Sequence, residues 1–209
     1  DGTTYAGEAL FAFVPPNTQP VPPFTRTATT TAVVTGVPAV IPVEPPVAFV
    51  TALYRTVLNR DPEPTALTFW VDQLRSGVSR QHMARAFWES PEHRGLQVEE
   101  FYRTYLRRAA DPAGRALWVN ALLSGRGEAG VAHAFLTSTE YLAAHNDATR
   151  FVTALYADVL GRAPDPIGQE YWRRQLQQGV SHVAVAKEIQ TSTEAYVKLV
   201  DRYYRDYLG

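Results

Sequence analysis

From about Pro46 onward, apolar residues recur with the period of an α-helix. In the first stretch of this kind, the spacing i, i+3, i+4, i+7 and i+8 predicts one buried helical stripe. The stripe occurs three times, as Val50, Leu53, Tyr54, Val57 and Leu58, as Val98, Phe101, Tyr102, Tyr105 and Leu106, and as Val152, Leu155, Tyr156, Val159 and Leu160. Three copies about fifty residues apart indicate a repeat protein whose units bury their apolar faces against one another.

Each stripe opens a longer motif with constant internal spacing. A tyrosine and a tryptophan lie sixteen residues apart, an arginine and turn residues lie between them, and an acidic residue follows in a later helix. The residues that we assign to this repeat signature are Tyr54, Arg60, Trp70 and Glu92 in the first unit, Tyr102, Arg108, Asp111, Gly114, Trp118 and Glu140 in the second, and Tyr156, Arg162, Asp165, Gly168, Trp172 and Glu194 in the third. We expect all of them to serve structure.

The polar residues between the stripes predict where helices begin and end. Asp-Pro at residues 111–112 and 165–166 is typical of a helix start, because the carboxylate caps free amides and proline is tolerated in the first turn. The first unit has Glu63-Pro64 there, and it has Ala66 in place of the glycine. Further starts are expected at Ser79, Ser90, Ser138, Ser181 and Ser192, and helix ends at Gly77, Gly125 and Gly179. We therefore predict a mainly α fold with three to four short helices per unit.

The domain organisation follows from this spacing. We predict helical repeats at residues 46–97, 98–149 and 150–200, and the start of a fourth at residues 201–209. The start of the fourth unit would be carried by Val200, Tyr203, Tyr204, Tyr207 and Leu208. Because that unit stops before its tryptophan, we expect the chain to be a piece of a longer protein.

Residues 1–45 differ in character from the rest. They hold eight of the fifteen prolines, nine threonines and only four charged residues. Proline excludes a lasting helix, so we expect an extended arm or linker. Two apolar stretches, residues 9–14 and 29–35, have the composition of short β-strands. Such stretches make poor free linkers, and the alternative to a simple linker is an arm that docks on the repeats or on a neighbouring molecule.

Charge and composition exclude several classes of protein. The chain has 20 basic and 21 acidic residues, so it lacks the basic excess of a nucleic-acid-binding protein. It has no cysteine, which excludes disulfides and thiolate metal sites. No stretch is long and apolar enough to predict a membrane span. Nor does any nucleophile-and-base pair, carboxylate pair or phosphate loop suggest an enzyme.

The remaining polar candidates have structural explanations. We expect Arg60, Arg108 and Arg162 to tie their own units together by pairing with the turn carboxylate, the later glutamate or helix carbonyls, and contact with an anionic ligand is the alternative. The three signature tryptophans are expected in the core, with stacking on sugars or bases as the alternative. Trp88 has no aromatic counterpart in the other units and is the better candidate for a contact surface. The five histidines show no zinc-binding spacing, and helix capping explains the aspartates without calcium, so we expect no cofactor, with calcium as the one alternative.

The pattern Tyr-x-x-x-Leu-Gly-Arg-x-Pro-Asp-Pro-x-Gly-x-x-Tyr-Trp is complete from Tyr156 to Trp172. It resembles the repeated bacterial domain of unknown function found in large secreted and surface-associated proteins, and the likeness covers about residues 46–209. The resemblance implies all-helical modules, often appended to hemolysin-type calcium-binding repeats or adhesin-like β domains. A fainter similarity to phycobilisome linker domains also implies a role in assembly. The family has no established catalytic residues, so the resemblance assigns none.

Two functions are consistent with these features. The first is a non-enzymatic structural module of an extracellular or cell-surface bacterial protein, part of a filament or surface layer, with copies of itself or adjoining domains as partners. The second is an adhesin-like module that binds a glycan or another surface component, with or without calcium, through a cluster of unlike residues present in one unit only. For the first, deletion of residues 1–45 is expected to leave the helices folded and to impair association.

Overall fold

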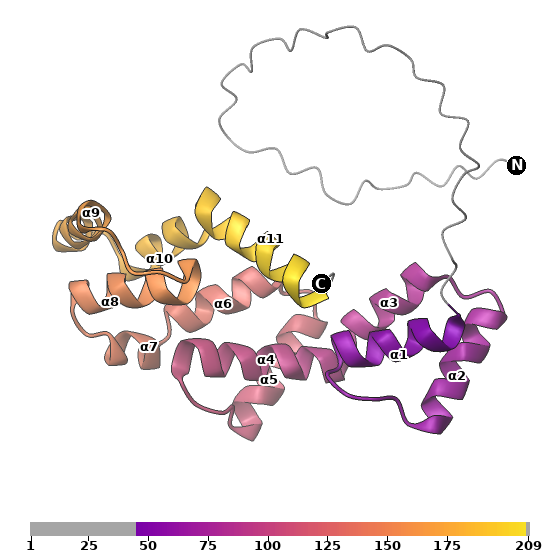
Figure 1. Cartoon of the computed structure of the whole chain (residues 1–209). Coiled ribbons are helices and arrows are strands. Elements are labelled where there is room, and N and C mark those ends of the chain that lie inside the picture. Colours follow the sequence, from indigo (N-terminus) through magenta and orange to yellow (C-terminus); the bar gives the residue numbers. More distant parts are fainter. Residues whose placement is uncertain (1–44, 208–209) are drawn as a thin grey trace, which may run out of the picture. The chain divides into compact units, whose positions relative to one another are not determined.

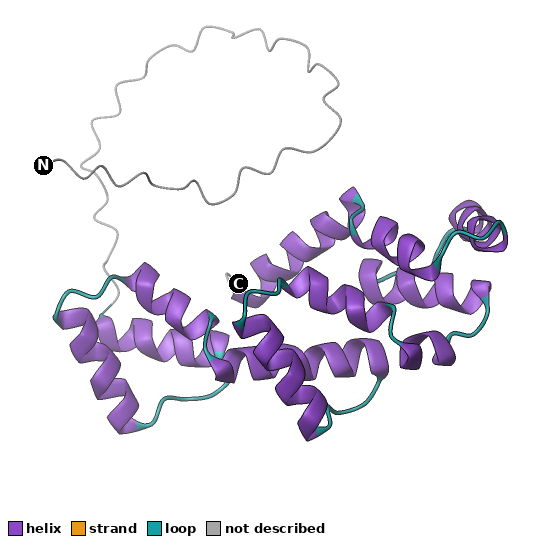
Figure 2. Cartoon of the chain, turned by 180° about the vertical axis from the view of Figure 1, so that it is seen from behind, coloured by secondary structure: helices purple, strands orange, loops and turns teal. Residues whose placement is uncertain are grey.

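The computed structural model of the chain describes residues 45–207 (Figure 1). The two strand-like stretches of the predicted arm lie outside the described residues. Between residues 45 and 207 the chain forms eleven α-helices and one π-helical segment, and no β-strand (Figure 2). The predicted mainly α fold of tandem helical repeats is therefore confirmed. No helix of this region is both long enough and apolar enough to cross a bilayer.

The helices form three successive units. The first contains α1 (Pro46–Val57), α2 (Pro64–Arg75) and α3 (Arg80–Trp88). The second contains α4 (Pro91–Leu106), α5 (Pro112–Leu123), α6 (Glu128–Leu136) and α7 (Thr139–Ala144). The third contains α8 (Ala148–Leu155), the π-helical segment η1 (Tyr156–Leu160), α9 (Pro166–Gln177), α10 (His182–Gln190) and α11 (Thr193–Tyr207). Each unit has its own buried apolar cluster, built from the predicted stripe and from the helices that follow it.

Two of the predicted unit boundaries fall inside continuous helices. The boundary between residues 97 and 98 lies within α4, and the one between residues 200 and 201 lies within α11. In both places the last helix of one unit continues into the first helix of the next, because no proline or turn residue interrupts the chain there. A single rigid helix thus sets the direction in which the second unit follows the first.

The junction between the second and third units is different. Glu92 and Tyr102 are ten residues apart, whereas their counterparts Glu140 and Tyr156 are sixteen apart. The additional residues break the helix into α7 and α8, and Asp147 caps the start of α8 by accepting a bond from the amide of Arg150 at 2.9 Å. In Figures 1 and 2, α2 and α5 project from one side, while α9 lies on the opposite side. The insertion therefore changes the orientation of the third unit, so that its second helix, α9, lies on the side opposite to α2 and α5. We call this third unit the reversed unit.

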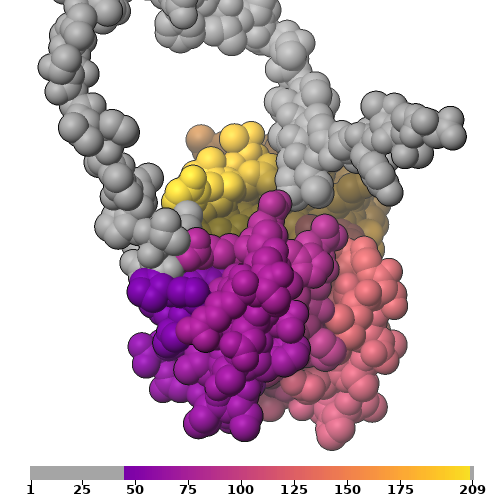
Figure 3. Space-filling model, turned by 90° about the vertical axis from the view of Figure 1, so that its right-hand side faces the viewer, coloured from indigo at the N-terminus to yellow at the C-terminus, as the bar shows by residue number. Residues whose placement is uncertain are grey.

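The reversed unit packs back against the earlier ones. Helix α10 contacts α6, where the side-chain amide of Gln190 donates to the carbonyl of Ala129 at 2.8 Å. Helix α11 contacts η1 and reaches α1 of the first unit. In the space-filling view of Figure 3, the first unit fills the near face and part of α11 is visible above it in yellow. The last helix of the described region therefore closes against the first unit.

Trp88 of α3 also contacts α11, through two tyrosines. Its ring centroid lies 6.0 Å from that of Tyr203 and 5.1 Å from that of Tyr207, both in edge-on arrangements. The equivalent positions in the other units are Leu136 and Gln190. The one tryptophan without an aromatic counterpart is thus covered by a helix of its own chain.

The helix ends follow the predicted pattern. The serine side chains predicted as caps accept bonds from backbone amides three residues further on, at 3.1–3.2 Å. Gly77, Gly125 and Gly179 have positive φ angles of 103°, 89° and 93° directly after the second helix of each unit. These left-handed positions favour glycine because it has no Cβ.

A second left-handed position precedes each signature arginine. It is occupied by Asn59 with φ of 54°, Arg107 with φ of 56° and Gly161 with φ of 66°. Glycine and asparagine adopt this conformation readily, whereas it costs another residue about 1–2 kcal/mol. At Arg107, where this conformational cost applies, the side chain donates hydrogen bonds to the carbonyl of Thr104 and to Asp158.

Candidate functional site

The signature arginines form the same arrangement in every unit, which we call the arginine clamp. Each guanidinium donates two hydrogen bonds to the glutamate thirty-two residues further along the chain and lies over the ring of its own signature tyrosine. The two bonds measure 2.5 and 3.0 Å for Arg60–Glu92, 2.7 and 2.8 Å for Arg108–Glu140, and 2.6 and 2.8 Å for Arg162–Glu194. The guanidinium carbon lies 4.8, 4.8 and 5.0 Å from the three ring centroids.

The turn carboxylates complete the clamp. Arg60 also donates to Glu63 at 2.9 Å, whereas Asp111 and Asp165 lie 3.5 and 3.8 Å from their arginines. Both aspartates instead cap the next helix by accepting from the amides of Gly114 at 2.8 Å and Gly168 at 2.9 Å. The arginine bonds hold the pKa values of Glu140 and Glu194 below their usual range. The clamp therefore joins the turn after the first helix of each unit to the helix that follows its third helix, and for the first unit that helix is the start of α4.

The clamp lies at the surface. The three arginine side chains keep 35, 40 and 41% of their surface exposed. Exposed ion pairs contribute little to stability, and the bidentate geometry and the stacking on an aromatic ring strengthen them. Because each arginine bonds the equivalent glutamate in its repeat, we assign the clamp a structural role.

The signature tyrosines explain the signature glycines. A Cβ on Gly168 would lie 2.7 Å from the hydroxyl oxygen of Tyr156, and a Cβ on Gly114 would overlap the hydroxyl of Tyr102. The signature tryptophans are partly buried and pack on the same clusters, with Trp70 and Trp118 each 5.1 Å from the phenylalanine of the third helix, Phe87 or Phe135. These residues thus form the centre of each unit.

A large concavity lies elsewhere, and none of the signature residues lines it. It has a volume of about 710 Å³ and is bounded by α4, α6, η1, α10 and α11. We call this concavity the groove. Its volume is within the range of about 300–1,000 Å³ that is typical of small-molecule sites. The groove exists only because the reversed third unit packs back on the second.

A buried carboxylate lies at one side of the groove. Asp158 belongs to η1 and its side chain is only 3% exposed. It accepts a hydrogen bond from the hydroxyl of Tyr141 at 3.0 Å and pairs with Arg107. Burial raises the pKa of Asp158, although both partners act in the opposite direction. The equivalent positions of the first two units are Thr56 and Thr104, so this carboxylate is specific to the third unit.

Glu128 lies at another side of the groove, and both of its carboxylate oxygens accept hydrogen bonds. It pairs with Arg94 at 3.0 Å, accepts from the side-chain amide of Gln97 at 2.9 Å, and accepts from the hydroxyl of Tyr203 at 2.8 Å. Burial raises the pKa of Tyr203, and the negative charge of Glu128 raises it further. Glu128 therefore links α6 to both α4 and α11.

Basic residues line the groove without such partners. Lys187 of α10 and Lys198, Arg202 and Arg205 of α11 are part of its wall. Within residues 45–207 none of the four forms an ion pair. Arg202 lies over the ring of Tyr203, with 5.9 Å between the guanidinium carbon and the ring centroid. The charges of the groove that lack a partner are therefore positive.

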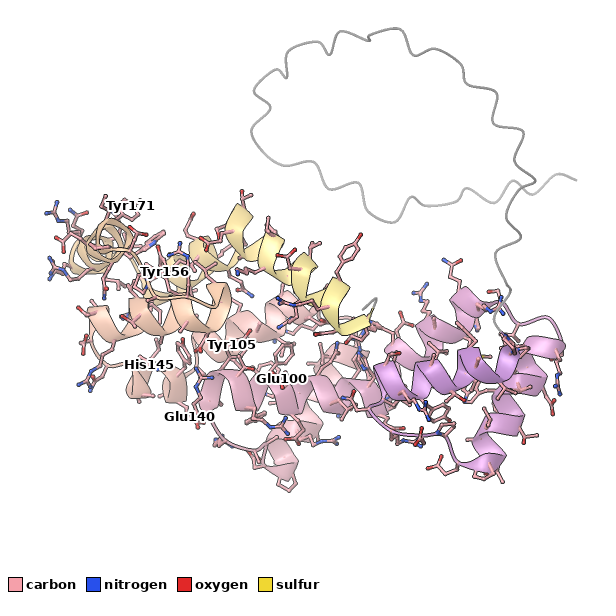
Figure 4. All side chains as sticks on the ribbon, in the orientation of Figure 1. Glu100, Tyr105, Glu140, His145, Tyr156 and Tyr171 are labelled. Carbon is pink, nitrogen blue, oxygen red and sulfur yellow. The ribbon has the colours of Figure 1, made fainter. Side chains whose placement is uncertain are left out.

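Tyr105 is a further unpartnered polar group of the groove. Its side chain, labelled in Figure 4, extends from α4 and packs against the apolar cluster of the third unit. Burial raises the pKa of Tyr105 to about 12, against a smaller lowering by the charge of Arg202. Its hydroxyl forms no hydrogen bond with any described residue. A protonated phenol thus lines the groove as a free donor.

The histidines do not form a metal site in the described region. Among residues 45–207, no group of three or more His, Asp or Glu side chains is arranged to hold a metal ion. His93 is the buried one: its Nδ1 lies 2.9 Å from the carbonyl oxygen of Val57, and its Nε2 has no partner within the described part of the chain. Burial lowers the pKa of His93. Its ring packs on Trp88 with the centroids 4.5 Å apart, so its role is in the core.

The comparisons with known proteins bear on the repeats. The sequence profile of the family described as a domain of unknown function, DUF4214, matches residues 46–97 and 132–199, more than half of the chain. The chain belongs to this family. No curated protein and no solved structure matches it. The DUF4214 profile leaves out residues 98–131, yet this segment carries Arg108 and half of a clamp with the same geometry as the other two.

Sequence reasoning did not identify the groove. Its polar residues are the ones that depart from the repeat, such as Asp158 where the other units have threonine. The available signal was therefore a difference between units, combined with the longer spacing before Tyr156. That signal marks unusual positions but does not show that they converge.

Proposed function

We propose that the helical repeats are a non-enzymatic assembly module of an extracellular or cell-surface bacterial protein, and that copies of the chain associate through α11. The location follows from the resemblance of the repeats to secreted and surface-associated proteins. Association is supported by one observation above all, a difference between two equivalent helices, α4 and α11.

Helix α11 exposes the face that α4 buries. In α4, Val98 and Tyr102 are 0% and 4% exposed, because α5 and α6 cover them. Their counterparts in α11, Val200 and Tyr204, are 51% and 62% exposed, and Val197 beside them is 54% exposed. We call these three residues the α11 stripe. Their spacing places them on the side of α11 away from the groove.

We propose a second copy of the chain as the occupant of this surface; in a longer chain, the fourth unit that residues 201–209 are expected to begin would cover the same stripe, as α5 and α6 cover Val98 and Tyr102. The stripe is apolar, it recurs identically in every copy, and two stripes related by a two-fold axis would cover each other. Burial of an apolar side chain in such a contact contributes about 1.5–3 kcal/mol. We expect sedimentation equilibrium to show an average mass above the 23.2 kDa of one chain, rising with concentration.

The decisive variant is Val200→Ser combined with Tyr204→Ser. It is expected to remain at the mass of one chain, while its helical circular dichroism stays unchanged. The matched control is Phe69→Ser combined with Leu117→Ser, which removes two apolar residues of similar exposure, 55% and 63%, from other helices. The control should associate like the wild type. A wild-type chain that stays monomeric, or a stripe variant that associates as strongly, would refute the proposal.

A binding function is the second candidate, and the groove favours it. The groove is a concavity lined by residues that differ between units, including Asp158, Lys187 and Arg202. Repeat proteins commonly present a binding surface on a framework of similar units. Under this function the clamps keep the units rigid, and the groove selects the ligand.

A further inference from the structure

We propose that the groove binds a small amphipathic anion, a molecule with an apolar chain and a carboxylate-type head. This inference rests on the binding function and is independent of association through the α11 stripe. The groove combines an apolar wall, acidic groups that are already neutralised, and basic groups that are not. Each of these three features restricts the chemistry of the ligand.

The apolar wall requires an apolar body. Phe101 of α4, Val159 and Leu160 of the third unit, and Leu199 of α11 line the groove with Ala132. These side chains come from four helical elements, α4, α6, η1 and α11, and they line a concavity with a volume of about 710 Å³. A sugar or a free inorganic anion would leave this wall without a contact, whereas an alkyl chain or a ring would cover it.

The acidic groups do not favour a cation. Glu128 is paired with Arg94 and receives the Tyr203 hydroxyl, and Asp158 is paired with Arg107 and receives the Tyr141 hydroxyl. A cationic ligand would have to displace these partners. Both carboxylates therefore act within the protein, and their negative charge is compensated before any ligand arrives.

The basic groups of the groove provide a binding site for an anionic head group. Arg202 of α11 and Tyr105 of α4 both line the groove, and together they offer a guanidinium and a hydroxyl donor. Lys187, Lys198 and Arg205 add positive charge around them. Charge-assisted bonds from a guanidinium to a carboxylate are among the stronger polar contacts in proteins. We infer that the head lies at Arg202 and Tyr105, with the chain along Phe101 and Leu199.

Isothermal titration calorimetry with three twelve-carbon probes tests this inference on the whole chain. Dodecanoate, used below its critical micelle concentration, is expected to bind with one molecule per chain. Dodecanol has the same chain without charge and should bind about tenfold more weakly, the loss of one charge-assisted contact. Dodecyltrimethylammonium, which reverses the charge, should bind more weakly still.

Two variants locate the head. Arg202→Gln should weaken dodecanoate about tenfold and leave dodecanol unchanged, and Tyr105→Phe should weaken dodecanoate by a smaller factor. The control Arg85→Gln removes an equally long cation from α3 of the first unit and should change nothing. The variant Val200→Ser combined with Tyr204→Ser should retain binding, which separates this inference from association.

Several results would overturn the inference. They are the absence of dodecanoate binding, equal affinity for dodecanol or for the ammonium probe, and an Arg202→Gln variant that behaves like Arg85→Gln. Binding of many probe molecules with loss of helical circular dichroism would show detergent action and would overturn it as well.

Discussion

Two glycines in helices provide a sharp test of how the units are packed. Gly114 in α5 lies against the signature tyrosine, and a Cβ there would overlap the hydroxyl of Tyr102 and approach its ring carbon to 3.1 Å. Gly130 in α6 has open space, since the nearest atoms belong to the flexible side chain of Arg126 at 3.8 Å. The same substitution to alanine should therefore have opposite effects at the two positions.

The magnitudes follow from two competing terms. Alanine is favoured over glycine within a helix by up to about 1 kcal/mol. Both glycines are the third residue of their helices, where the gain is smaller, so Gly130→Ala should stabilise the protein by about 0.5 kcal/mol. Overpacking costs about 1–3 kcal/mol, so Gly114→Ala should destabilise it by about 1–2 kcal/mol after the same small gain. For a protein of this size, each kcal/mol shifts the midpoint of thermal unfolding by about 2–4 °C.

Circular dichroism during thermal and urea unfolding measures both effects. The double variant Tyr102→Phe/Gly114→Ala removes the hydroxyl that the new methyl group meets, so it should recover part of the loss and show a coupling of about 0.5–1 kcal/mol. If Gly114→Ala raised the midpoint as much as Gly130→Ala, the tyrosine hydroxyl would not occupy that space. The proposed reason for glycine at this position of the signature would then be wrong.

Three further predictions concern the clamp, the buried histidine and the closing helix. Arg108→Gln removes a clamp and should lower the free energy of unfolding in urea by about 1 kcal/mol. Its control, Arg103→Gln, removes a cation with a weaker contact of 3.8 Å and should lower that free energy by less than about 0.5 kcal/mol. Equal effects of the two substitutions would contradict a stabilising role of the clamp. Burial lowers the pKa of His93 in the folded state. The stability that this neutral histidine contributes is therefore present above its unfolded pKa of about 6.5 and is lost as the pH falls below that value, by up to about 1.4 kcal/mol per pH unit. His93→Gln should flatten the pH dependence of the urea midpoint below about pH 6.5, and an unchanged slope would exclude this role. Trp88→Leu introduces the residue that the second unit has at this position and removes the contacts with Tyr203 and Tyr207. It should speed amide hydrogen exchange in residues 201–207 about tenfold, whereas Phe69→Leu should leave this exchange unchanged. Equal exchange in both variants would show that Trp88 does not stabilise the packing of α11.

Local features of the fold could be predicted from the sequence because they depend on residues close together in the chain. The period of the apolar stripes predicts the helices, and serines and glycines at their ends predict the caps and left-handed turns that the structure contains. The clamps also depend on one repeated distance, since Arg60, Arg108 and Arg162 each bond the glutamate thirty-two residues later. Because the spacing from arginine to glutamate is the same in all three copies, the clamp of one unit predicts the clamps of the other two.

The arrangement of the units depends on tertiary contacts. The additional residues around His145 and Asp147 break a helix that is continuous at the equivalent place in α4, and the direction of the chain after such a break is decided by what the following helices can bury. The reversed third unit then covers Trp88 with Tyr203 and Tyr207 and buries Asp158 beside Tyr141. By itself the sequence determined the helices, their caps and the spacing of the clamps. The groove and the exposed α11 stripe were decided only by the tertiary structure, because they depend on contacts between residues far apart in the chain, and helical periodicity carries no information about those contacts.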